Sequence, residues 1–204
     1  KGIRISYVDQ NQYGTFFVGN STDAASSLFL KDTVIVSNFP VVFVGKLNHQ
    51  GELEWIVKND DATQCYGQWE TLYAENAVLT DDAIYFDINT SDNFTFGGSL
   101  IVAGGSCDAS MYGSTLVKFN YHTKQTEWAM PFQMLYSYVG EIIEFEDKIY
   151  LTVSGYNESS NFSIGNNNIS LNTYFDSLMQ AHDLQMIFEI QNTGILNEAF
   201  LFAG

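Results

Sequence analysis

The stretch VGKLNHQGELEWIV, residues 44–57, decides the fold because its pattern recurs later in the chain. A short apolar run leads into a polar turn that contains Gly51, and an alternating run with Trp55 follows. LVKFNYHTKQTEWAM (116–130) and SLMQAHDLQMIFEI (177–190) have the same order. Two extended runs about a polar turn are typical of a β-hairpin. The three stretches therefore predict one hairpin that is repeated three times.

The three histidines of the chain support this repeat. Each stands six residues before a large aromatic residue, in the pairs His49 and Trp55, His122 and Trp128, and His182 and Phe188. A metal site requires ligands that converge, whereas the repeat places each histidine on the outer hairpin of a different unit. We therefore interpret the histidines as turn residues and as markers of the repeat.

Other extended runs recur ahead of these hairpins. Two short apolar runs about a tight polar turn occur in LFLKDTVIV (28–36), FTFGGSLIV (94–102) and FSIGNNNIS (162–170). Strands rich in β-branched and aromatic residues precede them, at GTFFVGN (14–20), AIYFDIN (83–89) and KIYLTVS (148–154). Still earlier come IRISYVDQNQ (3–12), ETLYAENAVL (70–79) and GEIIEFED (140–147). One unit thus contains two strands, a small hairpin, and two further strands joined by a turn.

A four-stranded antiparallel unit that repeats every 60 to 73 residues is typical of a β-propeller blade. A β-sandwich of unrelated strands is the alternative. We predict an all-β fold of propeller-type four-stranded antiparallel blades. The predicted repeats are 1–66, 67–137 and 138–193, followed by 194–204 as the trailing strand of a further or shared blade. Residues 174–182 and 192–200 also fit short helices.

The sequence resembles a known family at several of these markers. Phe94-Thr95-Phe96-Gly97 is similar to the TFG segment of the secreted bacterial-type β-propeller repeat, and Val44-Gly45-Lys46-Leu47 with Gly51 and Trp55 is similar to the rest of that repeat. KFNYHTKQTEW (118–128) also resembles the Trp-bearing repeat of quinoprotein propellers. The resemblance implies blades and no catalytic residue. The third unit departs from the pattern, with Gln180 and Phe188 in place of Lys and Trp.

Closed propellers have about 4 to 8 blades, so three units imply further blades. They belong either to a longer chain, as an initial Lys1 in place of Met also indicates, or to other copies. Exposed sheet edges recruit strands. We expect the partners to be other protein chains or copies of the same chain, which bind through sheet edges and loops.

The 204 residues carry 8 basic and 24 acidic side chains, a net charge of −16. Phosphate binding depends on Lys and Arg, so this balance excludes nucleic acid and anionic membrane surfaces as partners. No apolar run approaches the roughly 20 residues of a membrane span.

Six N-x-[ST] sequons indicate an extracellular or cell-surface protein with N-linked glycans. They begin at Asn20, Asn89, Asn93, Asn157, Asn161 and Asn168. An unmodified turn residue is the alternative at each position, because Asn is favoured in turns. In the same compartment Cys65 and Cys107, the two cysteines of the chain, are expected to form a disulfide.

Candidate catalytic residues are few. The acidic clusters 60–61, 81–82 and 144–147 lie at expected strand ends, where carboxylates are solvated. Asp9, Asn11 and Gly14 resemble the opening of a calcium loop but lack its distal Glu, which leaves calcium a weak expectation and a β-turn the alternative. The Gly97-Gly98 pair is interpreted as a hairpin turn with positive φ, not as a phosphate loop.

The expected inner strands supply few groups that could act at a propeller axis. Those groups are Arg4, Glu70, Glu75, Glu141 and Glu144. We therefore predict no catalytic, cofactor-binding or metal-binding residue, and a non-catalytic glycosylated repeat protein with a structural, adhesive or partner-binding role in a larger surface or fibrous assembly. The alternative is the propeller part of a secreted enzyme that acts on glycans or uses a quinone cofactor.

Overall fold

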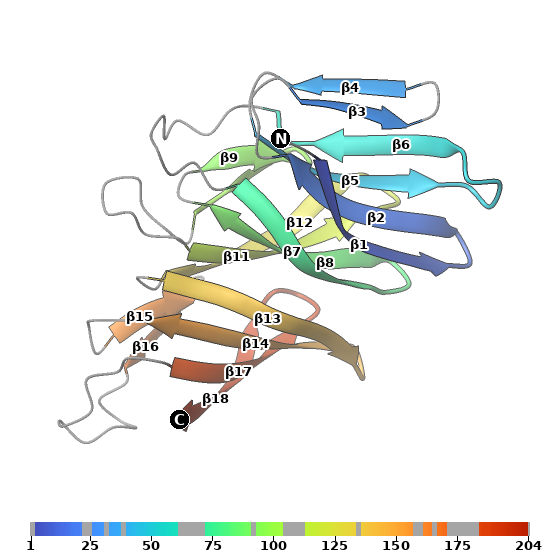
Figure 1. The fold of residues 1–204 in the computed structure, drawn as a ribbon. Coiled ribbons are helices and arrows are strands. Elements are labelled where there is room, and N and C mark those ends of the chain that lie inside the picture. Colours follow the sequence, from blue (N-terminus) through green and yellow to red (C-terminus); the bar gives the residue numbers. More distant parts are fainter. Residues whose placement is uncertain are drawn as a thin grey trace.

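The computed structural model describes residues 3–21, 26–30, 33–37, 40–60, 72–90, 93–103, 113–133, 136–156, 161–164, 167–170 and 184–203. These residues form an all-β fold of antiparallel strands (Figure 1). Within these ranges, no helix has the length and hydropathy that a membrane span requires.

Three four-stranded meanders follow one another along the chain. Sheet I contains β1 (Ile3–Asn11), β2 (Gly14–Ser21), β5 (Val41–Leu47) and β6 (Leu53–Lys58). Sheet II contains β7 (Leu72–Leu79), β8 (Ala83–Thr90), β11 (Gly113–Asn120) and β12 (Gln125–Gln133). Sheet III contains β13 (Tyr136–Phe145), β14 (Lys148–Tyr156), β17 (Leu184–Gln191) and β18 (Leu196–Ala203).

A small hairpin lies between the second and third strands of each sheet. These hairpins are β3 (Ser26–Leu30) with β4 (Thr33–Ser37), β9 (Phe94–Phe96) with β10 (Ser99–Ile101), and β15 (Asn161–Ile164) with β16 (Asn167–Ser170). The predicted all-β class and the predicted order of strands in four-stranded antiparallel units are confirmed.

The last strand of sheet III lies beyond the predicted boundary at residue 193. Residues 194–204 were predicted to be the trailing strand of a further or shared blade; in the structure β18 pairs with β17 from Leu184↔Ala203 to Ile190↔Leu196 and completes sheet III. A helix at 192–200 is excluded by the same pairing. Because β17 is a third strand, its Phe188 is not the counterpart of Trp55 and Trp128; the residue in that register is Glu198.

The three sheets stack in sequence order, with sheet II between the other two (Figure 1). We call the side of a sheet that contacts the next sheet its forward face, and the opposite side its rear face. Alternation along a strand sends successive side chains to opposite faces. Phe16 and Val18 of the forward face of sheet I pack with Ile84 and Phe86 of the rear face of sheet II.

The same arrangement recurs at the second junction. There Tyr85 and Leu116 of the forward face of sheet II pack with Ile149, Leu151 and other residues of the rear face of sheet III. Both faces of sheet II are therefore buried in apolar cores, as the continuous burial of β8 shows.

Two β-bulges recur at corresponding places in every sheet. The first-strand bulges fall between Ile5 and Tyr7, between Ala74 and Ala77, and between Val139 and Ile142. The outer-strand bulges fall opposite Lys46/Leu47, Lys118/Phe119 and Glu189/Ile190. Bulges are specific local features of strand pairing. Because the bulges recur at matching places, they define which residues of the three sheets correspond to one another.

The β9–β10 and β15–β16 hairpins each form a backbone hydrogen bond or strand pairing with the sheet that precedes their own sheet along the chain. Strand β15 pairs with β12 through Phe132↔Ile164 and extends the sheet that contains sheet II to six strands. At the earlier junction, the backbone N–H of Asp60, just after β6, donates to the carbonyl oxygen of Thr95 in β9 at 3.0 Å. The hairpins thus tie neighbouring sheets together.

Candidate functional site

An acidic cleft lies where turns from the three sheets meet. It encloses about 280 Å³, and its lining comes from the β1–β2, β7–β8, β13–β14 and β17–β18 turns and the adjoining strand ends. Five carboxylate residues line it: Asp9, Asp81, Asp82, Glu144 and Asp147. The first and third turns of a four-stranded meander lie at the same end of its sheet, so stacking the sheets gathers these residues.

The turns around the cleft are fixed by side-chain hydrogen bonds. The Oδ1 of Asn11 accepts from the backbone N–H of Tyr13 at 2.9 Å, and its Nδ2 donates to the carbonyl oxygen of Thr80 at 3.3 Å. The hydroxyl of Thr80 contacts both Asp82 Oδ1, at 3.1 Å, and the backbone of Ala83. The β7–β8 turn is therefore held to the β1–β2 turn.

The β13–β14 turn has an unusual backbone. Glu146 and Asp147 have φ angles of 51° and 61°, the left-handed conformation that two-residue hairpin turns of type I′ require. Asn and Gly usually occupy such positions, and carboxylate residues replace both of them here. The turn therefore presents charge to the cleft at the cost of backbone strain.

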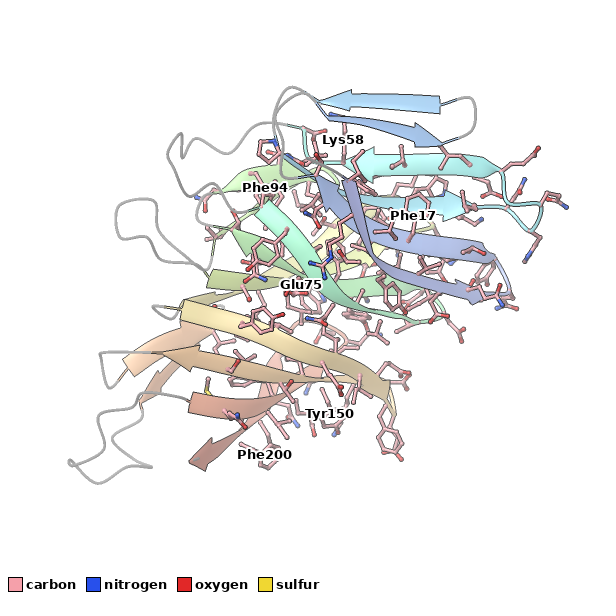
Figure 2. The ribbon with its side chains drawn as sticks, viewed as in Figure 1. Phe17, Lys58, Glu75, Phe94, Tyr150 and Phe200 are labelled. Carbon is pink, nitrogen blue, oxygen red and sulfur yellow. The ribbon has the colours of Figure 1, made fainter. Side chains whose placement is uncertain are left out.

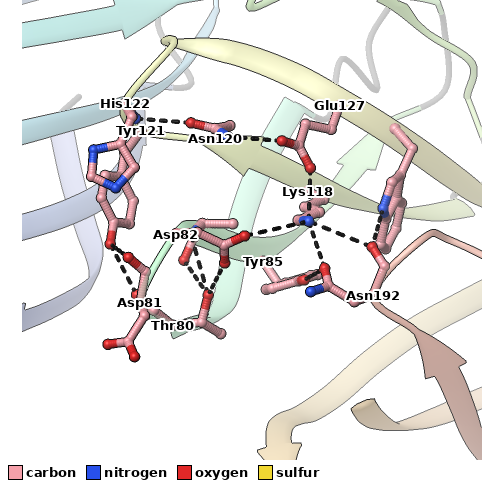
Figure 3. Close-up of polar contacts among 12 residues, drawn as sticks. Thr80, Asp81, Asp82, Tyr85, Lys118, Asn120, Tyr121, His122, Glu127 and Asn192 are labelled. Atoms are coloured by element: carbon pink, nitrogen blue, oxygen red, sulfur yellow. Dashed lines mark hydrogen bonds and ion pairs between the residues drawn. The ribbon is translucent and has the colours of Figure 1, made fainter. Parts of the chain in front are cut away.

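The wall of the cleft is organised by Lys118, which is 5% exposed. Its Nζ lies 2.5 Å from Asn192 Oδ1, 2.7 Å from Glu127 Oε2 and 3.9 Å from Asp82 Oδ2 (Figure 3). The same atom is 5.7 Å from the centre of the Tyr85 ring. These contacts satisfy the ammonium group, so Lys118 joins the β17–β18 turn to sheet II and is not a free nucleophile.

Nearby, the hydroxyl of Tyr85 donates to Asn192 Oδ1 at 2.6 Å. Burial, and then the negative charges of Asp82, Glu127 and Glu144, raise the pKa of Tyr85. The hydrogen bond from Lys118 lowers the pKa of Glu127. The Tyr85 hydroxyl therefore stays protonated and the Glu127 carboxyl stays ionised near neutral pH.

The Lys118–Glu127 pair has a counterpart in each of the other sheets. In sheet I, Lys46 Nζ lies 2.6 Å from Glu54 Oε2. In sheet III the charge is reversed, because Glu189 occupies the position of the lysine, and it accepts from Asn197 and pairs with Lys148 at 2.7 Å. In all three sheets the bulged residue of the outer strand thus contacts the charged residue of the third strand.

The cleft attracts cations and offers oxygen acceptors. Its lining contains no Lys, Arg or His, and the Lys118 ammonium behind the lining approaches only one of the five carboxylates, that of Asp82, at 3.9 Å among the ion pairs of the described residues. Over the part of the chain that the structure describes, no three His, Cys, Asp or Glu side chains converge to hold a metal ion. The weak expectation of calcium at Asp9 and Asn11 stays a prediction; Asp9 accepts from Tyr7 and from the backbone of Gln10.

A second polar cluster lies buried between sheets II and III. Asp87 Oδ1 accepts from the backbone N–H of Asn76 at 2.7 Å, within the first-strand bulge, and Oδ2 accepts from Asn89 at 3.0 Å. Asn89 in turn accepts from Ser114, which contacts Ser137 of β13. Burial raises the pKa of Asp87 from 3.8 to about 7. No local pattern of the sequence indicates this cluster, because its residues come from different strands, from β7 to β13.

Other predicted residues fall in separate places. His49 and His122 are exposed on the third turns of sheets I and II, and His122 packs edge-on against Tyr13 with ring centres 4.9 Å apart. Arg4 lies 3.3 Å from Glu75, which also accepts from Tyr138. Glu141 is exposed beside Thr152. Glu70, His182, Cys65 and Cys107 lie outside the described residues, so the disulfide stays a prediction.

The sequons differ in exposure. Asn20 and Asn89 are 3% and 1% exposed, and Asn89 Nδ2, the atom to which a glycan would be joined, donates to Asp87. Asn93 is exposed, and its Oδ1 accepts from the backbone of Ala103. The side chains of Asn157, Asn161 and Asn168 are not among those described. Among the three described positions, the fold therefore favours Asn93 for a glycan.

In comparisons with protein-family models, curated proteins and solved structures, no match to the chain was found.

Proposed function

We propose that the three sheets are blades of a β-propeller, and that the chain is a non-catalytic, glycosylated extracellular protein with a structural, adhesive or partner-binding role. The observation that carries this proposal is the residue-level repetition of the sheets. The same two bulges and the same third-strand contact recur in all three, at Lys46, Lys118 and Glu189. Repetition of one four-stranded antiparallel unit at this period is typical of propellers.

Contacts among the first strands support a common axis. Strand β7 contacts both β1 and β13. At this place Arg4 of β1, Glu75 of β7 and Tyr138 of β13 form a chain of polar contacts. The hydrogen bond to Glu75 raises the pKa of Tyr138 to about 12. First strands of neighbouring blades meet in this way around the centre of a propeller.

A binding role, as opposed to catalysis, is supported by the structural contacts that already occupy the buried charged groups. Lys118 is fully engaged in contacts that join two sheets, and Asp87 holds a bulge. These groups maintain the architecture. The enzyme alternative would place its site at the axis of a complete ring, and it stays a prediction.

The experiment for the extracellular assignment is secretion from eukaryotic cells followed by N-glycosidase treatment and intact-mass measurement. We expect a mass loss on treatment of the wild-type protein. Asn93→Gln should lose one glycan mass, because Asn93 is exposed. Asn89→Gln, at a 1% exposed position, serves as the matched control and should lose none. A secreted protein without any mass shift would contradict glycosylation.

The experiment for the propeller arrangement is a high-resolution structure from crystals or electron microscopy. We expect β1, β7 and β13 to surround one axis. Three sheets stacked as parallel layers without such an axis would contradict the proposal.

A further inference from the structure

We propose that Lys118 and Asn192 form a covalent amide bond that cross-links sheet II to the β17–β18 turn of sheet III. The side-chain amine of Lys118 takes the place of the amide nitrogen of Asn192, and ammonia leaves. This inference goes beyond the proposed function, because the reaction occurs once in each chain and needs no ligand. It follows from the contacts that surround the two side chains (Figure 3).

The two reacting groups are already in contact. Lys118 Nζ lies 2.5 Å from Asn192 Oδ1, and Cγ is bonded to that oxygen at about 1.2 Å. Nζ is therefore no more than about 3.7 Å from the carbon that it attacks, close to the roughly 3 to 3.5 Å of a productive approach. A small rotation of the carboxamide brings Nζ over the face of the carbonyl group. Lys118 is not free to attack a ligand, but its contacts hold it against this one electrophile.

The carboxamide of Asn192 is held in one orientation. Its Oδ1 accepts from the Tyr85 hydroxyl at 2.6 Å as well as from Lys118, and two donors identify this atom as the oxygen. The backbone carbonyl of Asn192 accepts from Trp128 Nε1 at 3.0 Å. Gly194, in the same turn, lies so close to the indole that a Cβ there would come within 2.9 Å of the ring. The turn thus keeps Asn192 beside Lys118.

Glu127 is the base that the reaction needs. Its Oε2 lies 2.7 Å from Lys118 Nζ, whereas Asp82, the other carboxylate near the amine, is 3.9 Å away. Lysine amines are protonated at neutral pH, so a proton must pass to Glu127 before the amine can attack. The hydrogen bond from Lys118 lowers the pKa of Glu127. The ion pair is therefore the state before reaction, and the reaction should be slow.

The reaction balances without a cofactor or an oxidant. Glu127 takes a proton from the Lys118 ammonium group, and Nζ forms a bond to Cγ of Asn192. Negative charge develops on Oδ1, where the Tyr85 hydroxyl donates a hydrogen bond that stabilises it. Protons pass from Nζ to Nδ2 through Glu127, and the Cγ–Nδ2 bond breaks. The nitrogen leaves with the electron pair of that bond as ammonium, and it escapes to solvent because Asn192 is exposed.

Sheet I has the base and the amine but lacks the other two groups. Lys46 and Glu54 form the corresponding pair at 2.6 Å. Phe16, which has no hydroxyl, stands in the register of Tyr85. The side chain that the next sheet places there is Tyr121, whose ring centre lies 4.4 Å from that of Phe16. Among the described residues, Lys46 Nζ contacts Glu54 and the Phe16 ring and no carboxamide.

Sheet III lacks the amine at this position. Figure 2 shows Tyr150, which has the register of Tyr85, on the side of sheet III away from sheet II. Its partner in the third strand is Glu189 in place of Lys118, and the Tyr150 hydroxyl donates to that carboxylate at 2.9 Å. Within the described part of the chain, the amine, base, hydroxyl and carboxamide therefore occur together at the junction of sheets II and III alone.

The bond would close a covalent loop between residues 118 and 192. Such a closure stabilises a protein mainly by constraining its unfolded chain, and thiols cannot reduce an amide. Because the reaction is slow, freshly folded chains still have the ion pair, and the contribution of that pair to stability is measured on them.

The test is the intact mass of the 204-residue chain, made in bacteria without N-linked glycans and with its cysteines reduced. Freshly folded protein is compared with protein stored at neutral pH for several days. We expect stored wild-type protein to lose the mass of one ammonia. Because cyclisation of an asparagine also releases ammonia, tandem mass spectrometry of a tryptic digest should find two peptides joined through Lys118 and Asn192.

Variants separate the roles of the four groups, and circular dichroism verifies that each variant folds. Lys118→Arg keeps the positive charge without the amine and should retain the sequence mass. Glu127→Gln removes the base and Tyr85→Phe removes the hydroxyl donor, so each should slow the loss of ammonia by about 100-fold or more. Lys46→Arg is the matched control, since Lys46 also pairs with a carboxylate, and it should react as wild type does.

A wild-type chain that keeps its sequence mass after storage would overturn the inference without the help of any variant. So would loss of ammonia that persists in Lys118→Arg, or joined peptides that exclude Asn192. Each of these outcomes leaves the proposed function standing, since that is tested separately by the glycan mass shift and the axis of the sheets.

Discussion

Substitution of the two neighbouring glycines in the β9–β10 turn should have clearly unequal effects. Gly97 and Gly98 have φ angles of 53° and 74°, which confirms the expectation of a hairpin turn with positive φ. Any L-residue at either position incurs left-handed strain of about 1 kcal/mol. A Cβ at Gly98 would meet nothing within 4 Å, whereas a Cβ at Gly97 would lie 2.9 Å from both the N and the Oγ1 of Thr126.

The clash at Gly97 falls on two hydrogen bonds. The Thr126 N–H donates to the carbonyl oxygen of Gly97, and its hydroxyl donates to that of Phe96, both at 2.9 Å. Each is worth about 1 kcal/mol. Gly97→Ala should therefore lower the free energy of unfolding by about 3 kcal/mol and Gly98→Ala by about 1 kcal/mol.

The assay is equilibrium unfolding in urea, followed by tryptophan fluorescence, with the slope of the transition checked for constancy. Gly98→Asn is a useful control, because Asn tolerates the left-handed region, and it should remain close to wild type. Equal losses for Gly97→Ala and Gly98→Ala would refute the reasoning, since the packing of the turn on Thr126 would then contribute nothing.

Three further predictions follow from the polar groups. Because burial raises the pKa of Asp87 from 3.8 to about 7, the folded chain holds a proton that the unfolded chain releases. The contribution of Asp87 to the stability of the wild-type protein therefore falls as the pH rises from about 4 to about 7, by on the order of 4 kcal/mol. Over that window the unfolding free energy of Asp87→Asn should rise relative to that of wild type. A difference that stays constant with pH would contradict this. Asp147→Gly relieves a left-handed φ of 61° and should stabilise the chain by about 1 kcal/mol, measured as a rise in Tm, while an unchanged or lower Tm would count against strain in this turn. Lys118→Met leaves Glu127 without its cation, although Asn120 still donates to it, and should destabilise by about 2 kcal/mol, less than breaking a fully buried pair because the Glu127 side chain is 36% exposed. In urea unfolding, the double variant with Glu127→Gln should recover part of the loss, and strictly additive losses would argue against the pair.

Much of the fold was predictable from periodicity. The β-branched and aromatic residues of AIYFDIN (83–89) and the turn at Gly97-Gly98 are local signals, and the structure places a strand and a tight turn there. The error in the third unit has a physical cause. Glu198 stands in the register of the tryptophans, so the aromatic marker is missing, and Phe188 on the preceding strand took its place.

The features of the candidate site were not predictable in the same way. The first-strand bulges carry no common residue, since Ser6, Glu75 and Gly140 occupy corresponding positions. The acidic cleft combines Asp9 with Asp147, which are remote in sequence and meet only because the sheets stack. Local patterns predict strands and turns, whereas such a site depends on how the sheets are placed.

The hairpins that bond to the preceding sheet have a consequence for unfolding. Because β15 pairs with β12, opening of sheet III that includes its small hairpin also breaks this pairing. The edge strand β12 of sheet II then loses its hydrogen-bonded neighbour. In a repeat array, stability depends on such nearest-neighbour terms as well as on each unit. Local opening of one sheet should therefore weaken the sheet before it more than the sheet after it, which gives the array a direction in which it comes apart.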